Sequence, residues 1–133
     1  MTIRTLLVLA SLFPAIARAD LGSGMFTEAQ VGRGDEIYRA RCVSCHGADL
    51  RGNSNSPSLL GMSFLFLWEG RSLGELYTKM RSGMPTDNPG SLPPNSYADV
   101  LAYVLASNGY PPGTSELGTD VSSLEAVIIA SPP

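Results

Sequence analysis

Apolar residues recur along much of the chain at the three- and four-residue spacing of short amphipathic helices. The first such segment runs from Glu28 to Val43, and Thr27 and Gln30 stand at its start with the spacing of a capping box. Its apolar side consists of Val31, Ile37 and Tyr38. The pattern predicts a helix from about Glu28 to Val43, with early turns weakened by two glycines.

Two more segments show a helical pattern. Ser72 and Glu75 form a second possible capping box before "LGELYTKMRSG", which predicts a helix of about ten residues that stops at Gly83. The segment "YADVLAYVLASNG" follows Ser96, and Asn108-Gly109 is a typical helix end. Its apolar positions fall on one side at helical spacing: Val100, Leu101, Val104 and Leu105.

The remaining segments have weaker patterns. "SFLFLWEG" is too short for its periodicity to distinguish a strand from a helix. The prolines of "MPTDNPGSLPP" exclude a regular helix there, so we expect a loop. The last residues, 113–133, have no strong periodicity, and their "AVIIA" run is too short to span a bilayer and is free to pack back on the domain.

The first 19 residues have the pattern of a signal peptide. A short basic start precedes the apolar run "TLLVLASLFPAI", and "ARA" before Asp20 has the form of a signal-peptidase site. A membrane-spanning helix needs roughly 20 apolar residues, so we expect no stable span after cleavage. We therefore expect an exported periplasmic protein, divided into a signal peptide (1–19), one domain (20–112) and a C-terminal tail (113–133).

Length and composition agree with one small domain. The chain has 133 residues, of which 44% are apolar and 16% charged. Cleavage after Ala19 would remove Arg4 and Arg18, leaving 7 basic against 12 acidic residues, a net charge of −5. An acidic surface of this kind makes nucleic acid a poor candidate partner. For so short a chain, a large apolar cofactor would add substantially to the core.

The segment "RCVSCHGADL" (41–50) contains both cysteines and the single histidine of the chain. Cys42, Cys45 and His46 have the C-x-x-C-H spacing, which is known above all for covalent attachment of a c-type haem. Residues three and four apart share one side of a helical turn, so two thioethers can fix the porphyrin edge while the imidazole reaches the iron. The spacing therefore predicts one covalent haem c, with His46 as the proximal iron ligand.

Other uses of these three side chains fit the sequence less well. An exported cysteine pair would normally form a disulfide, but two cysteines are too few for a disulfide-stapled scaffold. A thioredoxin-like redox pair needs strands alternating with helices, and no convincing strand pattern is present. A structural zinc ion needs four ligands, whereas the chain offers three Cys or His side chains.

The second axial ligand must come from a residue other than histidine. Methionine is the remaining soft neutral candidate, and four methionines follow the signal peptide: Met25, Met62, Met80 and Met84. We expect Met25 to form a flexible lead-in and Met62 and Met80 to pack in the core. Met84 lies in a loop between a glycine and Pro85, where a rigid backbone could hold the sulfur at the iron. Met84 is therefore the predicted ligand, and open five-coordinate iron is the alternative.

These motifs together resemble a class I monohaem cytochrome c. The resemblance rests on "YRARCVSCHG", "SPSLLG", "SGMPTDNPGSLP" and "YADVLAYVLASNG", and covers about residues 27–112. It implies an all-α fold of helices and loops wrapped around one haem, with His and Met as axial ligands. It also implies that the carbonyl of Pro57 accepts a hydrogen bond from the second ring nitrogen of the histidine. A plain turn proline is the alternative for Pro57.

Within that family, the chain is most similar to small exported bacterial cytochromes that serve periplasmic quinoprotein dehydrogenases. The resemblance implies a dehydrogenase as electron donor and a terminal oxidase or another cytochrome as acceptor. With one lysine, the chain departs from the lysine-rich docking face of the mitochondrial members. Four residues are candidate partners of the haem propionates, with ordinary packing or surface exposure as the alternative: Trp68, Arg71, Tyr77 and Arg81.

We therefore expect a one-electron carrier rather than an enzyme. With both axial positions filled, a substrate has no place on the iron. The rival hypothesis is a haem enzyme or gas-binding sensor with an open distal site, but the chain has no second histidine for acid–base chemistry. A tightly held subunit of a dehydrogenase complex is a third possibility, which the sequence does not distinguish from a free carrier.

Overall fold

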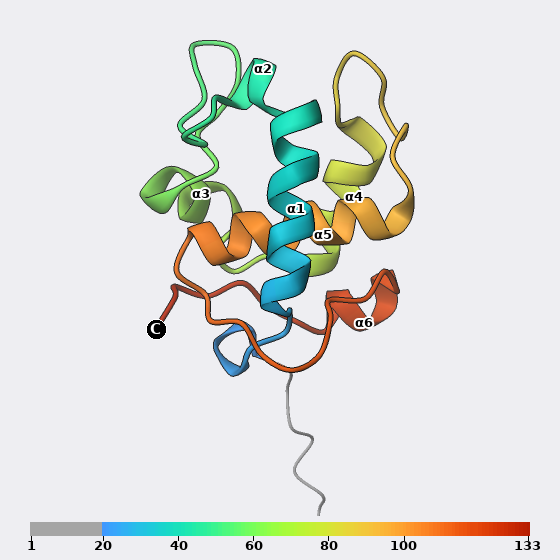
Figure 1. Cartoon of the computed structure of the whole chain (residues 1–133). Coiled ribbons are helices and arrows are strands. Elements are labelled where there is room, and N and C mark those ends of the chain that lie inside the picture. Colours follow the sequence, from blue (N-terminus) through green and yellow to red (C-terminus); the bar gives the residue numbers. More distant parts are fainter. Residues whose placement is uncertain (1–19) are drawn as a thin grey trace, which may run out of the picture.

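A computed structural model describes residues 20–133 as helices joined by loops and turns (Figure 1). The elements are a 3-10 turn η1 (Leu21–Ser23) and the helices α1 (Glu28–Arg41), α2 (Val43–His46), α3 (Gly61–Trp68), α4 (Leu73–Gly83), α5 (Pro94–Ser107) and α6 (Val121–Glu125). Across these residues there is no strand, and β pairing is limited to two isolated bridges. The predicted all-α fold is thus confirmed, while the predicted signal peptide lies outside the described residues.

The central contact of the fold is the packing of α1 against α5, which crosses behind α1 in Figure 1. Gly34 lies at the closest approach, because a Cβ atom built on it would meet the Asp99 carbonyl oxygen at 2.0 Å. Further along α1, the ring of Tyr38 packs on that of Tyr103 with centroids 5.3 Å apart. The glycine that weakens α1 as an isolated helix is therefore needed for its tertiary contact.

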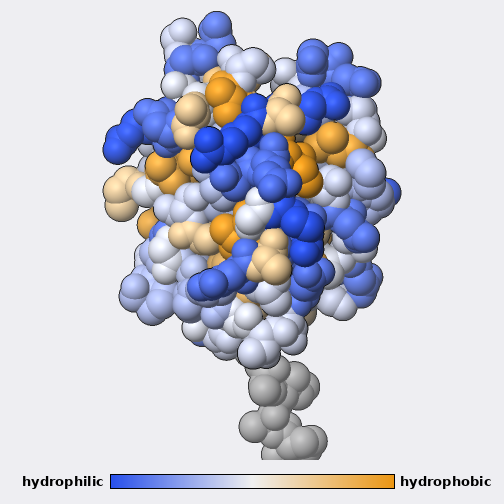
Figure 2. All heavy atoms as spheres, viewed as in Figure 1, coloured by the Kyte–Doolittle hydropathy of each residue, from blue (hydrophilic) through white to orange (hydrophobic). Residues whose placement is uncertain are grey.

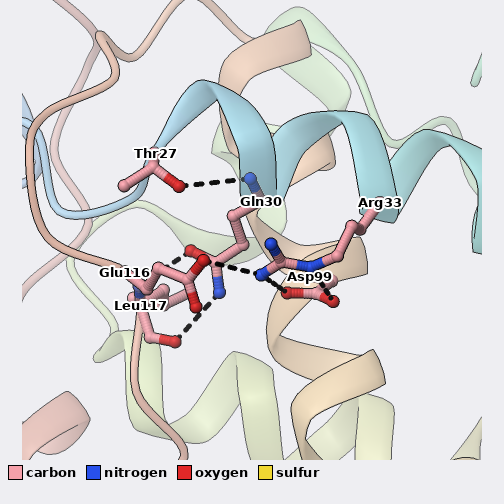
Figure 3. A network of polar contacts seen from close by, with 6 residues as sticks. All are labelled: Thr27, Gln30, Arg33, Asp99, Glu116 and Leu117. Atoms are coloured by element: carbon pink, nitrogen blue, oxygen red, sulfur yellow. Dashed lines mark hydrogen bonds and ion pairs between the residues drawn. The ribbon is translucent and has the colours of Figure 1, made fainter.

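The start of α1 differs from the predicted capping box. Thr27 caps the helix as expected, since its Oγ accepts the backbone N–H of Gln30 at 3.1 Å. Gln30 does not return to the backbone of Thr27. Instead its buried amide pairs with both backbone groups of Leu117, at 3.0 Å and 2.8 Å (Figure 3). The buried amide thus connects α1 to the C-terminal segment.

A second polar connection lies beside the first. The Arg33 guanidinium donates to both carboxylate oxygens of Asp99 on α5, each at 3.0 Å, and to Glu116 at 2.8 Å (Figure 3). Asp99 is buried, and this bidentate pairing satisfies its charge. Together with Gln30, Arg33 ties α1, α5 and the segment after α5 into one unit.

The other helix boundaries follow the predictions with small shifts. α1 ends at Arg41 rather than at Val43, because the backbone of Cys42 (φ −121°) leaves the helical region before α2 begins. α5 begins at Pro94 rather than at Ser96, since proline is well suited to the first turn of a helix. The predicted apolar side of α5 is buried, with exposures of 5% or less at Val100, Leu101, Val104 and Leu105.

The segment that the sequence left unassigned forms α3. Phe64 of α3 is buried in the core, but Met62 is 80% exposed and Phe66 is 89% exposed. The expectation that Met62 packs in the core is therefore wrong, because Met62 lies on the outer side of a short helix. The next helix, α4, begins with the complete capping box of Ser72 and Glu75, as predicted.

The C-terminal segment packs on the same core. Leu117, Leu124, Val127 and Ile129 are all buried. Ile129 exchanges backbone hydrogen bonds with residues 70 and 71 (2.8 Å and 2.9 Å), and the Leu73 N–H donates to the Val127 carbonyl at 2.8 Å. The "AVIIA" run therefore packs on the domain and fixes the start of α4. The division of the chain at residue 112 stays a prediction.

Among residues 20–133, none of the helices has the length and apolar character needed to cross a membrane.

Candidate haem-binding site

The C-x-x-C-H residues lie in the short helix α2 and at its N-cap, at one end of the molecule (Figure 1). The Cys42 carbonyl accepts the N–H groups of Cys45 (3.2 Å) and His46 (2.9 Å), which closes one helical turn over the motif. Cys42 is half-buried and Cys45 is exposed, and both are free thiols. The two sulfur atoms and the imidazole thus come from a single turn, as two thioethers and one axial ligand require.

The orientation of the His46 ring is fixed by the loop that follows α2. His46 Nδ1 lies 3.3 Å from the carbonyl oxygen of Pro57, which can accept a hydrogen bond when Nδ1 carries the proton. In that tautomer, Nε2 keeps its lone pair and is free to bind a metal. The structure therefore brings together His46 and Pro57, as the resemblance to a class I cytochrome c implied.

Three contacts that the sequence did not reveal hold α2 and this loop in place. The Tyr38 hydroxyl donates to the Gly47 carbonyl at 2.7 Å, and the Gly52 N–H donates to the His46 carbonyl at 2.8 Å. The Asn53 amide donates to the Cys45 carbonyl at 2.9 Å. The composition of "GNSNSP" indicates a turn, but it does not say which carbonyl a side-chain amide will reach.

The pKa of Cys42 separates this pair from a redox-active dithiol. Burial, with a smaller contribution from Cys45, raises the pKa of the Cys42 thiol to about 11. Reactive C-x-x-C motifs instead lower the pKa of one cysteine so that it ionises near neutral pH. Cys42 therefore keeps its proton at pH 7, which argues against the thioredoxin-like interpretation.

Met84 follows α4 directly and begins the loop 84–93, which lies at the same end of the molecule as α2 (Figure 1). Met84 is half-buried, and its N–H still donates to the Met80 carbonyl at 2.9 Å. Arg41, which precedes the first cysteine of the motif, reaches Ser91 of the loop at 3.4 Å. The structure thus places the predicted proximal and distal ligands on neighbouring segments.

The candidate propionate partners have other contacts in the structure. The Arg71 guanidinium stacks 4.4 Å from the Trp68 ring centroid and lies 3.4 Å from Glu75. Tyr77 donates its single O–H to the Pro94 carbonyl at 3.0 Å, so this group is not available to a carboxylate. Arg81 is exposed at the end of α4, close to the loop 84–93. Of the four residues, Arg81 therefore remains the best candidate partner for a haem propionate.

These side chains fit a covalently bound haem. Two free thiols and an imidazole with an available Nε2 lie on one turn, and a thioether sulfur lies in the neighbouring loop. Imidazole and thioether are a known axial pair for haem iron. Figure 2 shows apolar side chains at the surface on both sides of α1 in the half of the molecule that contains the motif. This end of the fold therefore offers both the ligands and an apolar surface.

The class of protein follows from this fold, this site and a comparison with known families. Residues 29–104 match the sequence model of the family described as cytochrome c oxidase, cbb3-type, subunit III. The protein is a small monohaem cytochrome c of the class I type, which carries a covalently bound c-type haem with its iron. More particularly, because the match covers more than half of the sequence, the chain belongs to this cbb3-type subunit III family.

Individual relatives agree with this class. The cbb3-type cytochrome c oxidase subunit CcoP of Rhodobacter capsulatus is 34% identical over 94 residues, which cover 59% of this chain and 30% of the relative. Cytochrome c-550 of Bacillus subtilis is 31% identical over 70 residues, which cover 53% of each chain. The chain thus spans about a third of CcoP and about half of cytochrome c-550.

A solved structure supports the fold alone. The sulfane dehydrogenase SoxCD of Paracoccus pantotrophus contains a chain that superposes on this one with a TM-score of 0.51 at 21% identity. The superposition covers 94% of this chain and 68% of the other. It therefore extends beyond the family match into the C-terminal segment.

Proposed function

We propose that this electron-transfer cytochrome is a periplasmic one-electron carrier in which His46 and Met84 are the axial ligands. The observation that carries the proposal is the arrangement of His46, whose Nδ1 faces the Pro57 carbonyl at 3.3 Å and whose Nε2 is left for a metal. The position of Met84 on the neighbouring loop supports it. An iron with two protein ligands has no coordination site for a substrate.

Each of these residues has a distinct part in the proposed mechanism. Cys42 and Cys45 hold the cofactor to α2 through thioether bonds, and the bond to Pro57 orients the imidazole of His46. The haem, when bound, supplies an iron that changes between the ferrous and ferric states. Met84 contributes a neutral sulfur, which favours the ferrous state and raises the reduction potential relative to more basic ligands.

The proposed electron donor is a periplasmic dehydrogenase, and the acceptor is a terminal oxidase or another cytochrome. The relative CcoP is a subunit of a cytochrome c oxidase, which supports an oxidase as acceptor, while the resemblance to cytochromes that serve quinoprotein dehydrogenases supports a dehydrogenase as donor. The signal-peptide pattern of residues 1–19 supports the periplasmic location. Encounters with such partners are expected to be small, below about 1,200 Å² of buried surface, because turnover requires release.

Carbon monoxide binding tests the proposal against the rival hypothesis of an open distal site. We expect the reduced wild-type protein to bind carbon monoxide slowly at neutral pH, because Met84 occupies the sixth position. Met84→Ala should bind the gas rapidly and should lose the far-red sulfur-to-iron absorption band of the ferric state. Met25→Ala is the matched control, since Met25 lines a hollow with Glu116 and Leu117 of the C-terminal segment, and it should behave like the wild type.

Two results would contradict this assignment. Rapid carbon monoxide binding by the wild type would favour a haem enzyme or gas sensor. An unchanged absorption spectrum of Met84→Ala would show that Met84 does not bind the iron. Gel filtration of a native extract distinguishes a free carrier from a subunit, because co-elution of the chain with a dehydrogenase or oxidase would identify it as a subunit.

A further inference from the structure

The loop 84–93 is closed by one buried hydroxyl group. Tyr97 of α5 is 2% exposed, and its O–H donates to the Met84 carbonyl at 2.7 Å. The same oxygen accepts the backbone N–H of Leu92 at 3.4 Å. A single phenol thus bridges the first and the penultimate residue of the loop.

A second buried tyrosine holds the segment just beyond the loop. Tyr77 of α4 is fully buried, and its hydroxyl donates to the Pro94 carbonyl at 3.0 Å. The two contacts are reciprocal. Tyr97 belongs to α5, after the loop, and binds the first residue of the loop, whereas Tyr77 belongs to α4, before the loop, and binds the residue that follows the loop. Both ends are thereby tied to the opposite helix.

The loop has few other contacts of this kind. Pro85, Pro89 and Pro93 have no backbone N–H to donate. The hydrogen bonds within the loop are local ones between Pro85, Asn88 and Ser91, and one longer bond, 3.4 Å, between Gly90 and the Met84 carbonyl. Ser91 is an exposed contact of Arg41, also at 3.4 Å. The tyrosine hydroxyls are therefore the buried, well-placed contacts that hold the loop to the helices.

We propose that Tyr97 and Tyr77 are positioning residues, and that their hydroxyls clamp the loop so that Met84 is held in place at the iron. This inference rests on Met84 being an axial ligand, as proposed above. Because the Tyr97 bond is made to the backbone of Met84 itself, its loss frees the residue whose sulfur must stay in position. The clamp thus governs how often the loop opens, without either tyrosine touching the iron.

Displacement of the methionine ligand by imidazole tests the clamp on the ferric holoprotein. Loss of the far-red sulfur-to-iron band after mixing with imidazole reports how often the loop opens. We expect Tyr97→Phe to exchange faster than the wild type by up to about tenfold, the factor that corresponds to one hydrogen bond. Tyr77→Phe should also accelerate the exchange, by a smaller factor, because it releases Pro94 rather than Met84.

Tyr110→Phe is the matched control. Tyr110 is 3% exposed, and its hydroxyl donates to the Ala130 carbonyl in the C-terminal segment, away from the loop 84–93. Tyr110→Phe should therefore lower the unfolding midpoint as the other two variants do, but its methionine ligand should exchange for imidazole at the wild-type rate. Equal exchange rates in Tyr97→Phe and Tyr110→Phe would overturn the clamp. If Tyr97→Phe yields no holoprotein, the test is made on Tyr77→Phe instead. Imidazole exchange at the wild-type rate in Tyr77→Phe would then overturn the inference.

The wild-type spectrum separates this test from that of the proposed function. If the ferric wild type shows the far-red band and Tyr97→Phe exchanges its methionine for imidazole at the wild-type rate, the clamp is contradicted and the assignment of Met84 as ligand stands. A wild type without the band would overturn the assignment of Met84, and with it the clamp.

Discussion

At the scale of single residues, the cysteines of the motif differ in surroundings although both are proposed to bind the same group. Cys42 is half-buried at the N-cap of α2, whereas Cys45 is exposed. The bonds from Cys45 and His46 to the Cys42 carbonyl keep the turn in shape. Since this turn forms from the protein's own backbone contacts, both thiols are carried on one helical turn, as two thioether bonds to one haem require.

Replacement of the cysteines tests the covalent attachment. We expect Cys42→Ala or Cys45→Ala to impair attachment and to lower the yield of folded holoprotein, because each removes one thioether. The measurement is the amount of haem that stays with the protein after acid-acetone extraction. Ser44→Ala, between the two cysteines, is the control and should retain normal amounts. Normal recovery of resistant haem from the Cys42/Cys45 double variant would refute the attachment.

The candidate site could be predicted in part from residue types. Cys42, Cys45 and His46 were found by their spacing, and Met84 by its place in a proline-bounded loop; the attachment through the two cysteines and the binding of the iron by His46 and Met84 stay predictions. The hydroxyl of Tyr97 was not found, because its partner is a backbone carbonyl 13 residues away in the sequence. Every residue type has a backbone carbonyl, so the sequence does not show which carbonyl accepts a hydrogen bond.

At the scale of elements, the crossing of α1 and α5 depends on one small residue. Gly34→Ala should destabilise the protein by about 3 kcal/mol, because its Cβ would meet the α5 backbone, which cannot move aside cheaply. Chemical unfolding of the holoprotein measures the change in the free energy of unfolding.

Gly32 provides the control for the same helix. Nothing lies within 4 Å of a Cβ built on Gly32, so Gly32→Ala should stabilise the protein by about 0.5–1 kcal/mol through its higher helix propensity. A similar effect of both substitutions would mean that Gly34 is not at a close helix crossing.

The helices themselves were predictable where capping and periodicity agreed. α4 and α5 have clear caps or a clear apolar side, and both were placed within two residues. α3 was not assignable, because a run of consecutive apolar residues has no periodicity and Phe64 and Phe66 face opposite environments. The exposure of Met62 has the same origin, since apolar character alone does not say which side of a helix a residue occupies.

At the scale of the whole molecule, the C-terminal segment acts as a strap that joins distant parts of the chain. It binds Gln30 of α1 through Leu117 and the start of α4 through Val127 and Ile129. Because α4 leads directly to Met84, the segment supports the loop from the opposite end of that helix. Its weak periodicity concealed this role, since these hydrogen bonds are made by backbone groups that lie outside α6 (Val121–Glu125).

Two adjacent isoleucines test the strap. Ile129 is fully buried, so Ile129→Ala should lower the free energy of unfolding by about 2–5 kcal/mol through lost packing and a residual cavity. Ile128 is 52% exposed, so Ile128→Ala should change it by no more than about 0.5 kcal/mol. Thermal or chemical unfolding of the two variants measures the difference. Equal effects would show that the segment does not pack as described.

The absorption spectrum of the exported protein, recorded oxidised and then reduced and extended to the far red, tests the central claim most directly. A six-coordinate His46/Met84 cytochrome c predicts c-type bands on reduction and a weak sulfur-to-iron band that is present when the iron is ferric. A c-type spectrum without that band would keep the haem but contradict the proposed ligand pair. The absence of c-type bands would contradict the covalent haem itself.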